Sequence, residues 1–191
     1  MNVRFLGDSY DIVKQSLLRW LSPLGPWTVH PMFTCDESAA HADEFSRLVG
    51  APLLSRQVLT PTTDRSEYFS SARVEANHLF LDPDTGLRAT VTRGAKGPNY
   101  LFLDELKSIA GRRAGALTLV FDQSIPRGSG ARAVEAKLAA CKAEGLHALA
   151  YTSQACFLLV ATEAATAARA YDTLRNESRL PETRFKVPSA A

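Results

Sequence analysis

A chain of 191 residues, of which 46% are hydrophobic and 22% charged, is long enough to form one globular domain with a sizeable core. Its formal net charge of +2 excludes a strong global field toward nucleic acid or an acidic membrane, although a local basic patch stays open. Three widely spaced cysteines without a CxxC pair exclude a disulfide framework and a zinc knuckle.

The first half of the chain is predicted to alternate between short strands, helices and one long loop. Capping by Gly7-Asp8-Ser9 begins the first helix, and proline and glycine end it. The expected elements are a strand at 3–6, a helix at about 10–21, a strand at 27–34 that Pro31 interrupts, a weaker helix at 35–50, and a loop or edge region at 51–66.

The second half is more regular. Its apolar runs and alanine-rich periodic segments predict three helices and four buried strands. They are a strand at 79–81, a helix at 100–110, a strand at 116–121, a helix at 131–144, strands at 147–153 and 155–161, and a helix at 164–176. The junction between the last two strands is short, so they form a hairpin or a bend.

This alternation predicts the α/β class. Strands that are apolar on consecutive residues are typical of a mostly parallel sheet covered on both faces, and the hairpin adds an antiparallel edge strand. We therefore expect a Rossmann-like three-layer sandwich in one domain over residues 1–180, followed by a tail at 181–191.

The expected location is the cytoplasm. The N-terminus carries an acid within its first ten residues and lacks the apolar stretch of a signal peptide. No segment approaches the roughly 18 apolar residues of a spanning helix. We expect a soluble protein without a membrane partner, and the sequence leaves the oligomeric state open.

Acidic residues follow three of the predicted strands. Asp8 follows the first, Asp82 and Asp84 the strand at 79–81, and Asp122 the strand at 116–121. Ligands of open α/β sheets bind at the carboxyl ends of the strands, so these acids are the best candidates for chemistry. On the first helix, Asp11 and Lys14 are three residues apart and lie on adjacent surface near the same edge.

A structural role competes with a functional one at each position. Aspartate is common at helix N-caps and strand exits because it hydrogen-bonds the backbone, and this explanation applies most strongly to Asp8. The pair Asp82 and Asp84 favours function, because one turn seldom needs two acids around a proline and a glycine.

Two basic segments are candidates for phosphate contacts. Arg127 lies in the loop after Asp122, and Arg88, Arg93 and Lys96 lie in a glycine-containing loop after the acidic turn. Arg112 and Arg113 add to the basic residues available for a binding surface. Ordinary solvated surface explains the same residues equally well.

The motifs GDSYDIVK, LFLDPDTGL and LTLVFDQSIPRG together resemble an uncharacterised bacterial family with an N-terminal Gly-Asp-x-x-Asp-x-x-Lys helix and a central Asp-Pro-Asp-x-Gly-Leu. That arrangement is in turn similar to the ribosomal RNA adenine-N6 methyltransferases, which carry a comparable N-terminal segment and a later Asp-Pro-Pro-Tyr. The likeness runs from about residue 5 to residue 127.

The resemblance implies a nucleic-acid-directed enzyme with S-adenosylmethionine as its methyl donor. Asp82 would accept a hydrogen bond from the target amino group of a flipped base, with Lys14 as a second functional residue. The cofactor would lie near Gly7 and the segment up to Thr34, with Asp122 and Ser124 as further contacts.

Two alternatives stay open. Asp84 and Thr85 stand where the motif has a proline and an aromatic residue, and two carboxylates at one turn suit Mg²⁺ or Mn²⁺. Asp82 and Asp84, with Asp8, Asp122 and Lys14, would then form a metal-dependent nuclease or phosphohydrolase. In the third hypothesis, the domain binds nucleic acid or a protein without catalysis. We rank methyl transfer first because the resemblance covers most of the chain.

Overall fold

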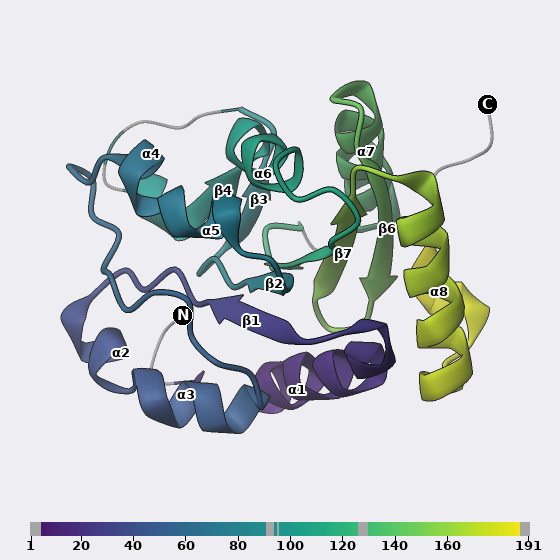
Figure 1. Ribbon diagram of the computed structural model, residues 1–191, viewed down its shortest axis with the longest axis horizontal. Coiled ribbons are helices and arrows are strands. Elements are labelled where there is room, and N and C mark those ends of the chain that lie inside the picture. The colour runs from purple at the N-terminus through teal and green to yellow at the C-terminus, as the bar shows by residue number, and fades with distance from the viewer. Residues whose placement is uncertain (1–4, 91–93, 95, 126–129, 188–191) are drawn as a thin grey trace.

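The protein folds around a mixed six-stranded sheet, and a small parallel sheet of two strands lies beside it (Figure 1). The computed structural model describes residues 5–90, 94, 96–125 and 130–187. The large sheet has the order β1 (Trp27–His30), β2 (His78–Leu81), β5 (Thr118–Asp122), β7 (Cys156–Ala161), β6 (His147–Thr152) and β8 (Phe185–Lys186). The small sheet pairs β3 (Gly86–Arg88) with β4 (Tyr100–Phe102).

The sheet is mixed rather than mostly parallel, which corrects the prediction. β1, β2 and β5 are parallel, whereas β7 is antiparallel to both β5 and β6, and β8 is antiparallel to β6. The physical reason is the three-residue connection between β6 and β7, since a parallel pair needs a crossover of a dozen or more residues. The expected hairpin is confirmed, but it places β7 inside the sheet.

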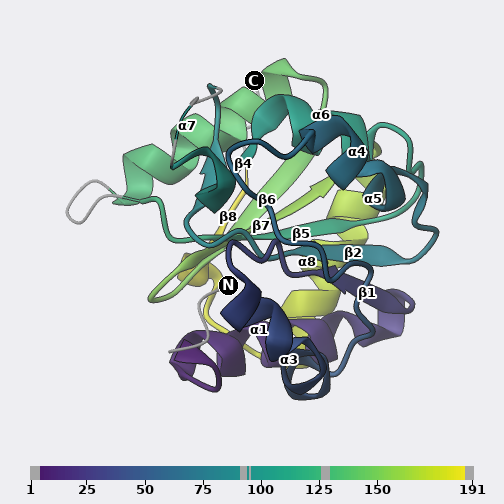
Figure 2. The same cartoon turned by 90° about the vertical axis from the view of Figure 1, so that its left-hand side faces the viewer.

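Helices cover both faces of the sheet. In Figure 2, α1, α3 and α8 lie on one face, and α4, α5, α6 and α7 lie on the other. The helices are α1 (Ser9–Leu21), α2 (Asp36–Ala40), α3 (Ala42–Val49), α4 (Arg65–Tyr68), α5 (Ser70–Val74), α6 (Leu103–Ala110), α7 (Gly130–Ala143) and α8 (Ala164–Ser178), with short 3₁₀ turns η2 (Ser22–Leu24), η3 (Gly97–Asn99) and η4 (Glu182–Arg184).

Each face of the sheet has its own apolar core. Phe80 of β2 packs with α1, α3 and α8, whereas its neighbours Leu79 and Leu81 pack with α6 and α7. Successive residues of a strand point to opposite faces, so a strand buried on both sides must be apolar throughout. The continuous apolar runs of β2, β5 and β7 therefore predicted the two cores correctly.

Several predicted boundaries differ from the structure. Phe5 and Leu6 form a turn that leads into α1, and residues 3 and 4 of the expected first strand lie outside the described residues. The helix expected from Tyr100 begins at Leu103, because Tyr100–Phe102 pairs with β3 instead. The helices α4 and α5 were not predicted, since runs of four and five residues are too short for a periodic pattern.

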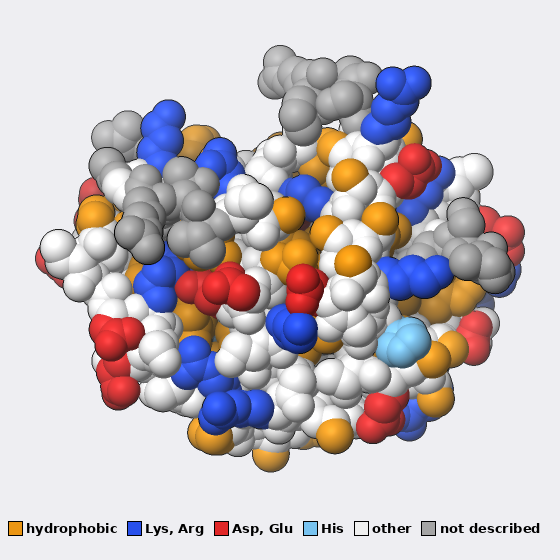
Figure 3. Space-filling view, turned by 90° about the horizontal axis from the view of Figure 1, so that it is seen from above, with side chains coloured by type: hydrophobic (Ala, Val, Ile, Leu, Met, Phe, Trp, Pro, Cys, Tyr) orange, Lys and Arg blue, Asp and Glu red, His pale blue; other side chains and the backbone are white. Residues whose placement is uncertain are grey.

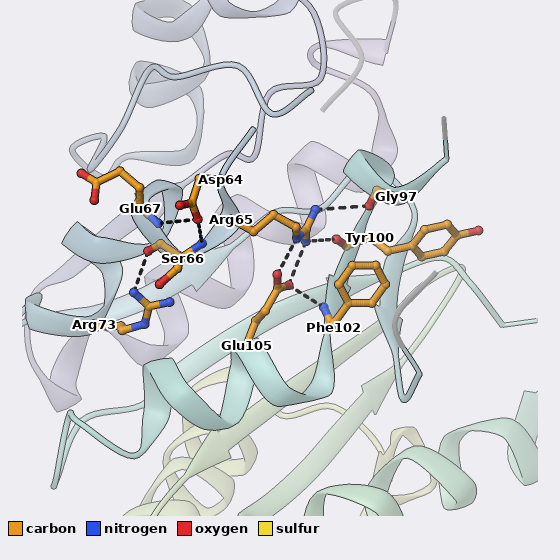
Figure 4. A network of polar contacts seen from close by, with 9 residues as sticks. All are labelled: Asp64, Arg65, Ser66, Glu67, Arg73, Gly97, Tyr100, Phe102 and Glu105. Carbon is orange, nitrogen blue, oxygen red and sulfur yellow. Dashed lines mark hydrogen bonds and ion pairs between the residues drawn. The ribbon is translucent and has the colours of Figure 1, made fainter. Parts of the chain in front are cut away.

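A contact network around Arg65 explains how these short helices are held (Figure 4). The guanidinium of Arg65 forms an ion pair with Glu105 of α6 and donates to the carbonyl oxygens of Gly97 and Tyr100, the latter at 2.7 Å. It also lies 4.6 Å from the centroid of the Phe102 ring. One side chain thus ties α4 to β4 and α6.

The C-terminal segment contributes to the sheet. Phe185 and Lys186, expected in a tail, form β8 against Tyr151 and Ala150 of β6, and the ring of Phe185 is buried. Within the described part of the chain, no helix combines the length and apolar composition needed to cross a bilayer.

Candidate functional site

The carboxyl ends of the strands meet at one edge of the sheet, where most of the predicted site residues lie. β1, β2 and β5 are parallel, and the backbone N–H of Asp82 donates to the carbonyl of His30 at the end of β1. The start of β7 is at the same edge, because Cys156 pairs with Asp122 in the register. Asp82, Asp84 and Asp122 therefore share this edge, as predicted.

Lys14 bridges two of the predicted acids beneath this edge. Its Nζ donates to Oδ1 of Asp11 at 2.9 Å and to Oδ2 of Asp82 at 3.0 Å. All three side chains are buried, with exposed fractions of 4% for Lys14, 3% for Asp11 and 1% for Asp82. We call these three residues the Lys14 cluster. The ammonium also lies 4.3 Å from the centroid of the Phe121 ring.

The charges of the Lys14 cluster are unequal, and the pKa directions reflect this. Burial lowers the pKa of Lys14, but Asp82 and Asp11 raise it by more, so the pKa lies above its ordinary value and the lysine stays protonated. Burial raises the pKa of Asp82, and Lys14 counteracts this only in part. One lysine cannot fully neutralise two buried carboxylates, so the pKa of Asp82, the more deeply buried acid, is raised.

The Lys14 cluster lines a pocket of about 310 Å³, which we call the acidic pocket. Four acidic side chains and one lysine contribute to its walls, so acidic groups outnumber basic ones among the described lining residues. Three aromatic residues, a proline and a glutamine form the remaining walls. Its lining residues are Phe5, Asp8, Tyr10, Asp11, Lys14, Asp82, Pro83, Asp84, Phe121 and Gln123.

Asp8 and Gly7 have clear structural roles at this pocket. Asp8 is the N-cap of α1, and its Oδ1 accepts hydrogen bonds from the N–H groups of Tyr10 and Asp11 at 2.8 and 3.1 Å. Gly7 has a φ of +83° and donates its N–H to Oδ2 of Asp11. Both residues therefore fix the first turn of α1 and thereby orient Asp11 and Lys14.

Asp122 and Ser124, predicted near a cofactor, belong to a second cluster. Lys137 of α7 forms an ion pair with Oδ2 of Asp122 and donates to the Ser124 hydroxyl and the carbonyl of Leu87. Ser124 donates both its hydroxyl and its N–H to Oδ1 of Asp122. In this Lys137 cluster, formed by Lys137, Asp122 and Ser124, one cation balances one carboxylate.

Lys137 was not among the predicted site residues, although the sequence of α7 carries a signal for it. Lys137 lies three residues after Val134 and four before Cys141, both buried, so it belongs to the inward stripe of α7.

Strand β3 approaches Asp122 so closely that it requires glycine at position 86. Gly86 has a φ of +136°, and any Cβ there would overlap Asp122.

A second pocket of about 540 Å³ adjoins the first, and the two share Tyr10 and Gln123 as walls. We call it the hairpin pocket, because the turn between β6 and β7 forms much of it. Its lining residues are Tyr10, Asp122, Gln123, Ile125, Gly130, Ala131, Val134, Thr152, Ser153, Gln154, Ala155, Cys156 and Lys186.

The basic residues named for phosphate contacts or a binding surface differ in their surroundings where the structure describes them. Arg113 is buried and donates to Thr118 and to the carbonyl oxygens of Glu75 and Asn77, so its proposed surface role is corrected. Arg88 stacks 3.8 Å from the centroid of the Tyr100 ring, and Lys96 is exposed. Arg93 and Arg127 lie outside the described residues. Figure 3 shows basic and acidic side chains interspersed on one face.

The carboxyl end of β1 is filled with side chains. His30, Met32 and Phe33 are fully buried, in the segment where the resemblance implied a cofactor. Among the described residues, neither ring nitrogen of His30 has a hydrogen-bond partner, and its ring packs against Tyr68 and Phe69. Burial lowers the pKa of His30 to about 4, so the ring is neutral at pH 7.

A divalent cation needs several oxygen, nitrogen or sulfur ligands close together. Within the described ranges, no three His, Cys, Asp or Glu side chains gather in a way that could hold a metal ion. The Lys14 ammonium lies between the carboxylates of Asp11 and Asp82 and takes the position that a cation would need.

Comparison of the chain with protein-family models, with curated proteins and with solved structures finds no match. The resemblance to the adenine-N6 methyltransferases, with the roles it implies, therefore stays a prediction.

Proposed function

We propose that the acidic pocket binds a group bearing an amine, and that the protein transfers a methyl group to the exocyclic amine of a nucleobase. The observation that carries this proposal is the Lys14–Asp82 ion pair at the wall of the pocket. Lys14 fixes Oδ2 of Asp82, and no hydrogen bond from the described residues reaches Oδ1. A carboxylate held in this way is a preorganised acceptor for an N–H donor.

The charge and shape of the pocket support the same chemistry. Four carboxylates repel phosphate groups and attract a cation or an amine. The aromatic rings of Tyr10 and Phe121 are flat walls suited to stacking and to cation–π contact. The positively charged sulfonium of S-adenosylmethionine fits these walls, and that group would supply the methyl when bound.

In this proposal each residue of the site has a distinct task. Asp82 accepts one hydrogen bond from the amine and orients its nitrogen, while Asp84 provides a second carboxylate at the same turn. Lys14 and Asp11 position Asp82, and Asp8 positions Asp11 through the α1 cap. The Rossmann-like classification and the cytoplasmic location remain part of this proposal.

Transfer of a tritiated methyl group from S-adenosylmethionine to single-stranded RNA and DNA oligonucleotides tests the proposal. We expect wild-type protein to label them, and Asp82→Asn and Asp84→Asn to lower the rate about a hundredfold. The exposed Asp104→Asn variant is the matched control and keeps full activity. Absence of label from every oligonucleotide would show that the protein is not a nucleic-acid methyltransferase.

One observation favours a binding module as the second candidate. The carboxyl end of β1, where the resemblance implied the cofactor, is filled by His30, Met32 and Phe33. A protein that has lost cofactor binding would still present the acidic pocket to an amine. Ligand-induced stabilisation by nucleosides, without stabilisation by S-adenosylmethionine or methyl transfer, would support this candidate.

A further inference from the structure

The acidic pocket and the hairpin pocket adjoin, and their electrostatic characters are opposite. Both are lined by Tyr10 and Gln123, so these two residues lie between the pockets. A ligand that passes these residues would contact both pockets at once. Together they offer room for more than a nucleobase.

The charged residues differ between the two pockets. The acidic pocket has four carboxylates against Lys14. In the hairpin pocket the charged lining residues are Asp122 and Lys186, and Asp122 is fully buried and already paired with Lys137. Lys186 is therefore the one cation of this lining that has no ion pair within the described part of the chain.

The other walls of the hairpin pocket offer neutral polar groups. Thr152 ends β6, Ser153 and Gln154 lie in the turn that follows it, and Gly130 and Ala131 begin α7. The N-terminal end of a helix carries a partial positive charge, which adds to that of Lys186. This pocket thus suits an anionic, hydroxyl-bearing group, which the acidic pocket would repel.

We propose that the two pockets together bind a nucleotide whose base carries an exocyclic amine, with the base in the acidic pocket and the phosphate in the hairpin pocket beside Lys186. This assignment rests on the proposed function for the base and adds the substrate class and its orientation. Tyr10, shared by both pockets, lies at the sugar.

Calorimetric titration with adenosine 5′-monophosphate, inosine 5′-monophosphate and adenosine tests this orientation. We expect the adenine nucleotide to bind at least about tenfold more tightly than the inosine nucleotide, whose keto group cannot donate to Asp82. We expect Lys186→Gln to weaken the adenine nucleotide by about tenfold and to leave adenosine unchanged. The exposed Lys142→Gln variant is the matched control and binds both as wild type does.

Three results would overturn the proposal. They are equal affinity for the adenine and inosine nucleotides, unchanged nucleotide affinity in Lys186→Gln, and an equal loss for nucleotide and nucleoside in that variant. The failure of the proposed function is distinguishable, because the expected binding pattern without methyl transfer would support the orientation and contradict the reaction. Methyl transfer without this binding pattern would support the reaction and contradict the orientation.

Discussion

The Lys14 cluster and the Lys137 cluster are built from the same parts but differ in balance. In each, a lysine from a helix reaches an aspartate at or just after the carboxyl end of a strand. Lys14 is shared by two buried carboxylates beside a pocket, whereas Lys137 holds one carboxylate that also accepts from Ser124. The first cluster has two carboxylates for one lysine, whereas the second has one of each.

This difference separates a candidate site from a structural link. The Lys137 cluster joins β5, α7 and the carbonyl of Leu87 in β3, and neither Lys137 nor Ser124 lines the hairpin pocket. Strand-end aspartates are therefore ambiguous by themselves. The number of cations available to each buried carboxylate distinguishes the two cases.

The largest expected effect is that of Lys14→Met. Removal of the lysine leaves Asp11 and Asp82 buried without the ammonium that both contact, so we expect a loss of about 3–5 kcal/mol in the free energy of unfolding at pH 7. Urea denaturation measures it. A loss below about 1 kcal/mol would contradict the account of an unbalanced buried cluster.

The pH dependence of unfolding provides the control for this variant. The pKa of Lys14 is raised in the folded protein, so its contribution is complete below the unfolded value of about 10.5 and is lost as the pH rises through the folded value. Wild-type protein therefore loses stability in alkali that Lys14→Met does not. The pKa of Asp82 is raised, so the variant regains stability as the pH falls from 7 toward 4.

Gly86→Ala tests the packing of β3 against Asp122 of the Lys137 cluster. At a φ of +136° the new Cβ would overlap Asp122 and force β3 away from β5. We expect a loss of about 3 kcal/mol from strained backbone and displaced packing, measured by chemical denaturation. The same substitution at exposed Gly94, which has open space around its Cβ position, is the matched control for positive φ alone.

Lys137→Met is expected to cost less than Lys14→Met. The side chain of Lys137 is 17% exposed, and Asp122 keeps two hydrogen bonds from Ser124. We expect a loss of about 2 kcal/mol at pH 7 with unchanged ligand binding at the acidic pocket. If this variant abolished binding while Lys14→Met did not, the roles of the two clusters would be reversed.

His30→Leu gives the smallest effect at pH 7 and extends the comparison to a buried ring that has no hydrogen-bond partner within the described part of the chain. Replacing an unsatisfied buried ring by a hydrocarbon side chain should stabilise the fold by about 1 kcal/mol at pH 7. The pKa of His30 is lowered to about 4, so the unfolded chain binds a proton that the folded chain does not, and stability falls below pH 6.5. Thermal unfolding from pH 7 to pH 4 should show this acid-induced loss in wild type and a smaller one in the variant.

The sequence could place the residues of the Lys14 cluster at one edge of the sheet, because each residue carries a signal within its own segment. Asp11 and Lys14 are three residues apart on one helix, and Asp82 follows an apolar strand that parallel pairing brings to the same edge. The wall residues Tyr10, Phe121 and Gln123 were not predicted, since ordinary packing uses the same residue types.

Other parts of the fold depend on contacts between distant segments. β3 and β4 have three residues each, and α4 is held by Arg65 through Glu105, forty residues away. Pairing of β8 with β6 likewise depends on the burial of Phe185 in a core formed by segments that are distant in the sequence. Short elements of this kind carry no periodic pattern, so only the folded chain reveals them.

One thermal-shift titration with adenosine, whose base carries an exocyclic amine, compares the two clusters most directly. Asp84→Asn alters the acidic pocket, and Ser124→Ala alters the Lys137 cluster. We expect adenosine to raise the unfolding midpoint of wild type and Ser124→Ala equally and that of Asp84→Asn little or not at all. An equal rise in Asp84→Asn, or a loss confined to Ser124→Ala, would contradict the assignment of the acidic pocket as the functional site.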